Sequence, residues 1–198
     1  MSDVYQAIAN SPVGKKIFSS LNLPIPVILD RYTPGQTSFI KGDVIVGAAP
    51  GSKAVTTVLA TLKGAGDARL HTLAGLAAEA DVQKAAGTAG VSVGNYTASK
   101  EDSQKFKALV FDATGIKNTA ELRALYDFFH PLTRKLDKCG RIVVIGRIPE
   151  HCALEQRIAQ RGLEGLVKSL GKEIKKASVA NLIYVDEGAD AQIASPLH

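Results

Sequence analysis

The sequence predicts an α/β fold with a doubly wound, mostly parallel sheet. Continuous apolar runs carry this prediction, because strands buried on both faces lack the alternation of half-exposed strands. Helix-length segments separate the runs, and right-handed crossovers place helices on both faces of such a sheet. We therefore expect four neighbouring parallel strands at residues 44–47, 108–112, 141–146 and 180–185.

Weaker patterns fill the gaps between these strands. The predicted elements are short strands at 68–75 and 91–96, a weak helix at 76–90, and longer helices at 118–138 and 155–176. The final residues, 186–198, read as the start of one more helix with no strand after it. We therefore expect a domain that is truncated at its C-terminus.

An N-terminal extension precedes this domain. Residues 2–20 read as a helix that Ser11 and Pro12 kink or divide, since the residue before a proline is biased away from helix. The prolines of LNLPIPVILDRYTPGQ, at residues 21–36, forbid helix and indicate an extended connector. The predicted organisation is an N-terminal helix and connector over 1–41 and the α/β domain over 42–198.

Composition favours a cytoplasmic globular protein. The chain has 198 residues, 45% of them hydrophobic, which suffices for one domain with a sizeable core. No apolar run approaches the roughly 20 residues that span a bilayer, and the N-terminus lacks the features of a signal peptide. Cys139 and Cys152 make neither a disulfide framework nor a metal site. We expect no metal and no membrane association.

The net charge is +5, and lysines gather near the end of the last long helix. They are Lys168, Lys172, Lys175 and Lys176. A helix face with several lysines can bind an anionic partner, or it can simply be exposed to solvent. In the second case, the lysines also complement the helix dipole near the C-terminal end. No helix-turn-helix, RNP or zinc pattern is present, so we expect no nucleic acid partner.

The turn after the first strand is the candidate cofactor loop. A dinucleotide site needs glycines where the backbone approaches the pyrophosphate, and a helix N-terminus that receives its charge. Gly47 and Gly51 fit this need, but Lys53 stands where a third glycine is expected. Lys53 can obstruct the cofactor or pair with a phosphate, and the glycines can equally serve a plain turn. Asp112, which ends a strand on the ligand side, is a further candidate or a turn-capping carboxylate.

Several stretches together resemble the short-chain dehydrogenases. DVIVGAAPGSK, at 43–53, is similar to their first strand and cofactor turn, and ALVFDATGI, at 108–116, to their fourth strand and Asn-Asn-Ala-Gly motif. The connector, GRIVVIG at 140–146 and RIAQRGLEGLVKSLGKEIKK at 157–176 are most similar to the N-terminal domain of the high-molecular-weight 3-oxoacyl-ACP reductases. The resemblance implies a degenerate Rossmann-like domain, either short-chain dehydrogenase-like or flavodoxin-like.

The same resemblance implies a reductase of fatty-acid metabolism. In that family, a complete C-terminal ketoreductase domain reduces a 3-oxoacyl thioester of acyl carrier protein or coenzyme A with NADH or NADPH. The implied partners are therefore that C-terminal domain of the same polypeptide, a second subunit in a homo-oligomer, and the thioester carrier through the full-length protein. We expect this chain alone to bind no cofactor.

The catalytic residues of the family are replaced in this sequence. By the resemblance, Arg147 stands at the serine position, Gln156 at the tyrosine position and Gln160 at the lysine position. In the family, the tyrosine donates a proton to the carbonyl oxygen of the substrate. The lysine lowers the pKa of that tyrosine and holds the nicotinamide ribose. Glutamine neither titrates nor carries charge, so we assign no catalytic residue to this chain.

Tyr96 and Lys100 have the four-residue spacing of the family's catalytic pair, but they precede the fourth strand and lack a helix to fix their geometry. We interpret the pair as a coincidence of spacing. His130 beside Tyr126 suggests acid–base chemistry, but we expect both to flank a packed helix. The cysteines have no histidine nearby in sequence, which disfavours a nucleophile.

Three functions remain open from the sequence. The first is a non-catalytic domain that packs against and orients a catalytic ketoreductase domain. The second is a stand-alone short-chain reductase that uses other residues. The third is a nucleotide- or flavin-binding module in which Gly47, Gly51 and Lys53 hold a phosphate.

Overall fold

The computed structural model describes residues 4–31, 33–36, 38–66, 68–99, 101–197. The chain forms two compact units, Met1–Tyr32 and Thr33–His198. The second unit contains the whole sheet and is called the α/β unit below. Each unit is described by itself.

The N-terminal unit is a pair of short helices with an extended segment folded back on them. Helix α1 (Val4–Asn10) and helix α2 (Pro12–Ser20) meet at Ser11, whose side chain accepts a hydrogen bond from the amide of Gly14. The expected break at Ser11 and Pro12 is therefore present, with proline in the first turn where its missing amide costs nothing. The side chain of Asn10 donates to the carbonyl of Pro26 at 3.0 Å and ties the connector to α1.

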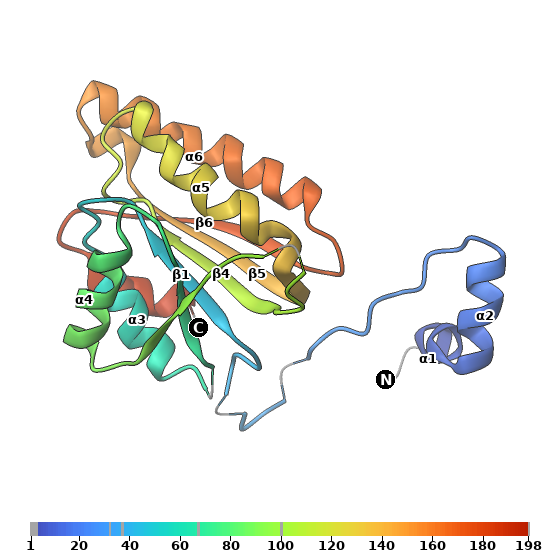
Figure 1. The fold of residues 1–198 in the computed structure, drawn as a ribbon. Coiled ribbons are helices and arrows are strands. Elements are labelled where there is room, and N and C mark those ends of the chain that lie inside the picture. The colour runs from blue at the N-terminus through green and yellow to red at the C-terminus, as the bar shows by residue number, and fades with distance from the viewer. Residues whose placement is uncertain (1–3, 32, 37, 67, 100, 198) are drawn as a thin grey trace. The chain divides into compact units, whose positions relative to one another are not determined.

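Six parallel strands form one sheet in the order β3-β2-β1-β4-β5-β6 (Figure 1). The strands are β1 (Val44–Ala48), β2 (Leu70–Leu73), β3 (Val93–Tyr96), β4 (Phe106–Asp112), β5 (Leu136–Arg147) and β6 (Val179–Val185). The four strong apolar runs are the neighbours β1, β4, β5 and β6, so this prediction is confirmed. The strand order reverses between β1 and β4, and crevices at such points are where open α/β sheets bind ligands.

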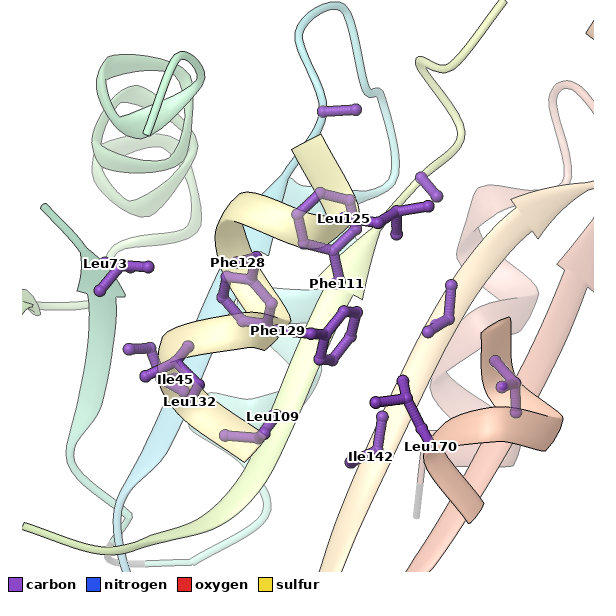
Figure 2. Packing of buried hydrophobic residues seen from close by; sticks show 14 of the residues in the cluster. Ile45, Leu73, Leu109, Phe111, Leu125, Phe128, Phe129, Leu132, Ile142 and Leu170 are labelled. Atoms are coloured by element: carbon purple, nitrogen blue, oxygen red, sulfur yellow. The ribbon is translucent and has the colours of Figure 1, made fainter. Parts of the chain in front are cut away.

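Helices cover both faces of the sheet (Figure 1). One face carries α5 (Arg123–Leu132) and α6 (Leu154–Glu173), and the other carries α3 (Val55–Lys63), α4 (Glu79–Ala89) and α7 (Ala194–Leu197). Each face has its own apolar core, and Figure 2 shows the one under α5, where Phe128 and Phe129 pack on Phe111. This is the doubly wound, mostly parallel fold that the sequence predicts.

Two predicted helices end earlier than expected. The helix predicted at 118–138 becomes a 3₁₀ turn, α5 and a second 3₁₀ turn, and residues 136–138 belong to β5. Pro131 lies in the last turn of α5, where it cannot support continuation of the helix. The helix predicted at 155–176 ends at Glu173, because Ile174 adopts an extended conformation with ψ 144°. Lys175 and Lys176 therefore lie beyond the helix.

Candidate functional site

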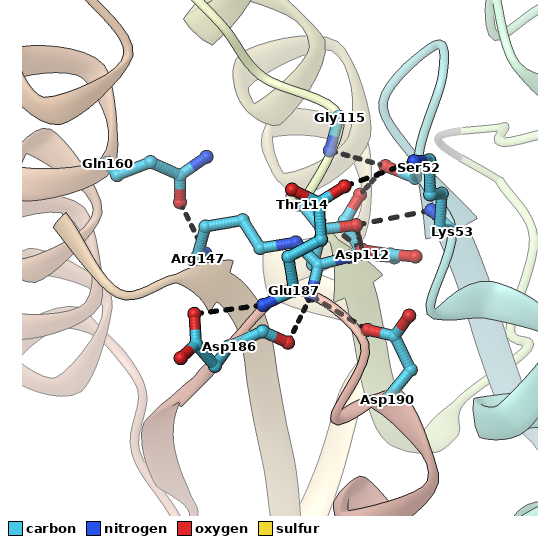
Figure 3. Close-up of polar contacts among 10 residues, drawn as sticks. All are labelled: Ser52, Lys53, Asp112, Thr114, Gly115, Arg147, Gln160, Asp186, Glu187 and Asp190. Atoms are coloured by element: carbon cyan, nitrogen blue, oxygen red, sulfur yellow. Dashed lines mark hydrogen bonds and ion pairs between the residues drawn. The ribbon is translucent and has the colours of Figure 1, made fainter. Parts of the chain in front are cut away.

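The candidate site is a cleft at the carboxyl ends of the strands. Its volume is about 310 Å³, and loops after β1, β4, β5 and β6 line it. The side chains that face it include Lys53, Thr114, Lys117, Arg147, His151 and Gln156. Figure 3 shows the polar contacts that organise this end of the sheet.

The loop between β1 and α3 holds Gly51 and Lys53, two of the predicted cofactor residues. Gly47 lies inside β1, and a Cβ atom there would lie 2.5 Å from the ring of Phe128, so this glycine makes room for α5. Gly51 has a φ of +74° and turns the chain into the loop. The exposed Nζ of Lys53 lies 3.2 Å from Oε1 of Glu187, which follows β6.

This loop packs directly against the loop that follows β4 (Figure 3). The amide of Lys53 donates to Oγ1 of Thr114 at 3.2 Å, and the amide of Gly115 donates to Oγ of Ser52 at 3.1 Å. A Cβ atom on Gly115 would lie 2.5 Å from the nitrogen of Ser52, so the two backbones are in contact. The amide of Lys53 is therefore bonded to protein and the amide of Ser52 is covered by Gly115. In a glycine loop that binds a phosphate, such amides are offered to the ligand.

Asp112 places a carboxylate at the start of α3. Its side chain is 1% exposed, and its Oδ1 accepts hydrogen bonds from the amide and the hydroxyl of Thr114 at 2.9 and 2.7 Å. Burial raises the pKa of Asp112, although Thr114 and the nearby amides of Val55 and Ala54 favour its charged form. Among the described residues, Oδ2 has no partner at hydrogen-bonding distance. The predicted turn-capping role is present, in a deeply buried form.

Arg147 ends β5 and connects it to the segment after β6. Its guanidinium Nη1 donates to the carbonyl of Asp186 and to Oδ1 of Asp190, both at 2.8 Å. The side chain is 9% exposed, so it is held between these partners and only borders the cleft. Beside it, Nδ1 of His151 lies 3.0 Å from Oδ2 of Asp186, and this contact lowers the pKa of Asp186.

Gln160 belongs to α6 and is fully buried. Its Oε1 accepts the amide of Arg147 at 2.9 Å, and its Nε2 donates to the carbonyls of Ala113 and Ile116, each at 2.9 Å. This side chain therefore links α6 to the ends of β4 and β5, and both amide hydrogens are used. Gln156, one turn earlier on α6, is partly exposed and lines the cleft.

Tyr96 lies on β3, and the residues that line the cleft do not include it. Its hydroxyl donates to Oδ2 of Asp102 at 2.6 Å, and its ring packs edge-on against Phe106 at 4.9 Å between centroids. Burial, followed by the hydrogen bond and the charge of Asp102, raises the pKa of Tyr96 to about 12. Lys100 lies outside the described residues.

Of the remaining sequence candidates, Cys152 lines the cleft, whereas the lining residues do not include Tyr126, His130 or Cys139. Tyr126 and His130 stack on the outer face of α5 with centroids 4.8 Å apart, while Phe128 of the same helix is fully buried. Sγ of Cys152 donates to the carbonyl of Ile148, and burial raises the pKa of this thiol. Within the described part of the chain, neither Cys139 nor Cys152 forms a disulfide.

In the described part of the chain, no group of three His, Cys, Asp or Glu side chains is arranged to hold a metal ion. None of the helices described combines the length and the apolar character needed to cross a membrane.

Several features of this region were not predicted from the sequence. They are the hydrogen bonds of Gln160, the ion pairs of Lys53 and Arg147, and the cleft positions of Lys117 and His151. Only their positions just after apolar strands could have signalled them, because the carboxyl ends of parallel strands meet at one edge of a sheet.

Comparison with known proteins supports the fold. No protein-family model matches the chain, and no curated protein is significantly similar to it. A short-chain dehydrogenase/reductase from Serratia marcescens BCRC 10948 superposes with a TM-score of 0.56 at 16% identity, covering 78% of this chain and 88% of that one. A dehydrogenase/reductase from Sinorhizobium meliloti 1021 gives a TM-score of 0.55 at 16% identity, covering 80% and 81%. A putative oxidoreductase from Escherichia coli K-12 gives 0.52 at 16% identity, covering 79% and 88%. The chain thus has the Rossmann-like fold of the short-chain dehydrogenases/reductases.

Proposed function

We propose that this chain is a non-catalytic domain with the short-chain dehydrogenase fold, which packs against and orients a catalytic ketoreductase domain. The observation that carries the proposal is the buried side chain of Gln160, at the position of the family's lysine. All of its hydrogen-bonding groups engage the protein backbone, so it is committed to holding strand ends together.

The neighbouring positions support the same conclusion. Arg147, at the serine position, is held by Asp186 and Asp190 and has no hydroxyl to offer a substrate carbonyl. Gln156, at the tyrosine position, lines the cleft but cannot supply the proton that a developing alkoxide needs. A proton donor of this kind contributes roughly 10²–10⁴ in rate.

The fold family implies NADH or NADPH, and the residues of this chain do not fit it. A pyrophosphate is held by free backbone amides and the positive end of a helix dipole. Here the loop amide of Lys53 is bonded to Thr114, and the Asp112 carboxylate stands at the start of α3. A dianionic pyrophosphate would displace these contacts and approach a buried carboxylate of like charge.

The proposed partner is a C-terminal ketoreductase domain of the same polypeptide, acting in the cytoplasm on thioesters of acyl carrier protein or coenzyme A. The sequence resemblance supplies this assignment, and α6 supplies a surface that suits it. Leu163 and Val167 of α6 are buried, whereas Leu154 and Ile158 of the same helix are 69% and 54% exposed. Exposed apolar side chains on one helix are typical of a surface that contacts another domain or subunit.

The first experiment separates this function from the stand-alone reductase. The chain is titrated with NADH and NADPH by calorimetry, and oxidation of each is followed with acetoacetyl-coenzyme A. We expect no saturable binding below about 1 mM and no turnover, with a catalytic ketoreductase domain as positive control. Turnover that Lys53→Ala abolishes would show a working cofactor loop and contradict the proposal.

The second experiment tests the assembly role. We expect the catalytic domain joined to this chain to turn over acetoacetyl-coenzyme A. Ile158→Glu replaces an exposed apolar side chain of α6 with a charged one. This change should weaken the association of the two domains when they are supplied as separate chains. Ser169→Glu, on an exposed position of the same helix, is the matched control. Equal association of both variants would remove this surface from the proposal.

A second candidate function is binding of a small anionic ligand in the cleft. Basic side chains favour it, because Lys53, Lys117 and His151 all face a volume of about 310 Å³. Calorimetry with inorganic phosphate, ADP and FMN tests it, with Lys117→Ala as the variant and Lys84→Ala on α4 as the control. Saturable binding that only Lys117→Ala weakens would establish the site, and heat without saturation would dismiss it.

A further inference from the structure

Positive charge is concentrated where the strands begin, at the end of the sheet opposite to the cleft. Three segments form this surface: 105–107 at the start of β4, 134–141 at the start of β5, and 172–179 between the end of α6 and the start of β6. They hold nine lysines and arginines against two acidic residues, Asp137 and Glu173. The net charge of the whole chain is +5, so the rest of the chain is slightly acidic.

Eight of these cations are called the basic surface below, because the ninth, Lys135, is buried and lies beside Asp102. The eight are Lys105, Lys107, Arg134, Lys138, Arg141, Lys172, Lys175 and Lys176. All of them are exposed to solvent except Lys107, which is half-buried.

Hydrogen bonds to the backbone join the three segments. Nζ of Lys107 donates to the carbonyl of Lys138 at 2.7 Å, and the amide of Cys139 donates to the carbonyl of Lys176 at 2.9 Å. Lys107, Lys138 and Lys176 therefore follow one another at the starts of β4, β5 and β6. Neighbouring strands lie about 5 Å apart, so these cations form a short row across the sheet.

The basic surface differs from other charged parts of the α/β unit in its lack of acidic partners. Arg123, Arg147 and Arg161 each form an ion pair with a carboxylate. Of the ion pairs among the described residues, none involves Arg134, Lys138, Arg141, Lys172, Lys175 or Lys176. Their charge is thus left for a partner that is not this chain.

The backbone of this surface is strained. Cys139, Lys176 and Ala177 have φ values of +51°, +59° and +57°, and they are three of the four non-glycine residues with positive φ in the described part of the chain. The amide of Ser178 donates to the carbonyl of Lys175 at 3.3 Å and closes a tight turn that presents both lysines. Strained backbone of this kind is typical of ligand sites, where function retains it.

The chemistry of the basic surface points to one class of anion. Phe106 is the only aromatic residue of the three segments and is buried, so no ring is offered to stack on unpaired bases. Among large apolar side chains of the segments, only Val179 is exposed, so the surface has no apolar anchor for a bilayer. A phosphate backbone, in contrast, is bound by cations alone.

We propose that the basic surface binds the phosphate backbone of a double-stranded nucleic acid, without preference for sequence. The absence of helix-turn-helix, RNP and zinc patterns bears on the reading of bases, and backbone contacts need none of them. The proposal therefore departs from the expectation drawn from those patterns. It does not depend on whether the cleft binds a ligand or whether the domain is catalytic.

Fluorescence anisotropy with short labelled DNA and RNA duplexes of mixed sequence tests the proposal on the full chain. We expect saturable binding with a dissociation constant of about 10⁻⁴–10⁻⁶ M at physiological salt. Between about 50 and 200 mM salt, the logarithm of the association constant should fall against that of the salt concentration with a slope of about −3 or steeper, because each phosphate contact contributes about −0.9. Duplexes of different sequence should bind within about threefold of one another.

Two charge reversals locate the binding site. Lys138→Glu and Lys175→Glu should each raise the dissociation constant about fivefold or more and make the salt slope less steep by about 1. The matched control is Lys84→Glu, which makes the same change of charge at an exposed position of α4 and should bind as the wild type does. Urea unfolding checks that each variant is folded.

Sedimentation with vesicles of phosphatidylserine and phosphatidylcholine separates a nucleic acid from a lipid surface. We expect the vesicles to retain less of the chain than the duplex does at the same salt. No saturable duplex binding below about 1 mM, affinity that ignores salt, an equal loss in Lys84→Glu, or binding to vesicles alone would each overturn the proposal. These variants lie outside the cleft and the exposed apolar side chains of α6, so such a failure leaves the proposed function untouched.

Discussion

The amide of Arg147 donates to Oε1 of Gln160 at 2.9 Å, so a side chain of α6 closes the carboxyl end of β5. The same side chain reaches the carbonyls of Ala113 and Ile116 through Nε2. Three backbone groups from two strand ends thus depend on one buried residue. Gln160 therefore ties α6 to the ends of β4 and β5 beside the cleft.

Replacing this residue should cost much of the stability of the fold. Gln160→Leu keeps a similar volume but leaves the amide of Arg147 and two carbonyls unsatisfied, at about 1–3 kcal/mol for each group that stays buried. We expect the free energy of unfolding to fall by about 3 kcal/mol, measured by urea denaturation. The control is Gln156→Leu on the same helix, which should change it by only about 0.5 kcal/mol.

Placing a lysine at this position, as the resemblance to the short-chain dehydrogenases implies, should not stabilise the fold. Gln160→Lys would bury a cation without a carboxylate partner and remove the acceptor for Arg147, which costs about 3–5 kcal/mol. Circular dichroism melting measures the loss. A variant as stable as the wild type would mean that the site accepts lysine and that we have misjudged the role of Gln160.

Gly47 should be intolerant of a methyl group, in contrast to an exposed glycine. Gly47→Ala places Cβ 2.5 Å from the ring of Phe128, inside a packed core, and should cost about 1–3 kcal/mol. Gly171→Ala, in α6 with nothing within 4 Å, should instead stabilise the fold by up to about 1 kcal/mol. Urea midpoints of both variants measure the contrast. Equal effects would show that the β1–α5 contact is looser than the structure indicates.

Asp43 should make stability fall at acid pH. Although burial opposes its charge, hydrogen bonds from Arg69 and Gln104 lower its pKa below the usual 3.8. A lowered carboxyl pKa stabilises the fold above the unfolded value and loses that effect as pH falls through the folded value. Asp43→Asn should therefore cost about 1–3 kcal/mol at pH 7, and the difference from wild type should shrink steadily below pH 4. A difference that does not change with pH would exclude this role for the charge.

The sequence predicts the sheet well because its signal is local. Apolar runs such as 108–112 and 141–146 are long enough to identify buried strands without knowledge of their neighbours. Helix ends were less accurate, since the apolar period continues past Glu173 while the backbone does not. The hydrogen bonds of Gln160 could not be predicted, because its partners lie 13 to 47 residues away.

Tyr96 should behave as a structural tyrosine and not as an acid–base group. A catalytic tyrosine of the kind that the short-chain dehydrogenases use needs a lowered pKa, whereas burial and the Asp102 carboxylate raise the pKa of Tyr96 to about 12. Tyr96→Phe removes a hydrogen bond of 2.6 Å to Asp102, and should cost about 1 kcal/mol of stability. The ultraviolet difference titration between wild type and Tyr96→Phe should show no tyrosine ionising below pH 10. The activity of a longer chain that carries the catalytic domain should stay within about a factor of 2, which is less than 0.5 kcal/mol. A tyrosine that titrates near neutral pH, or a tenfold loss of activity in a folded variant, would make the Tyr96 spacing a real catalytic signal.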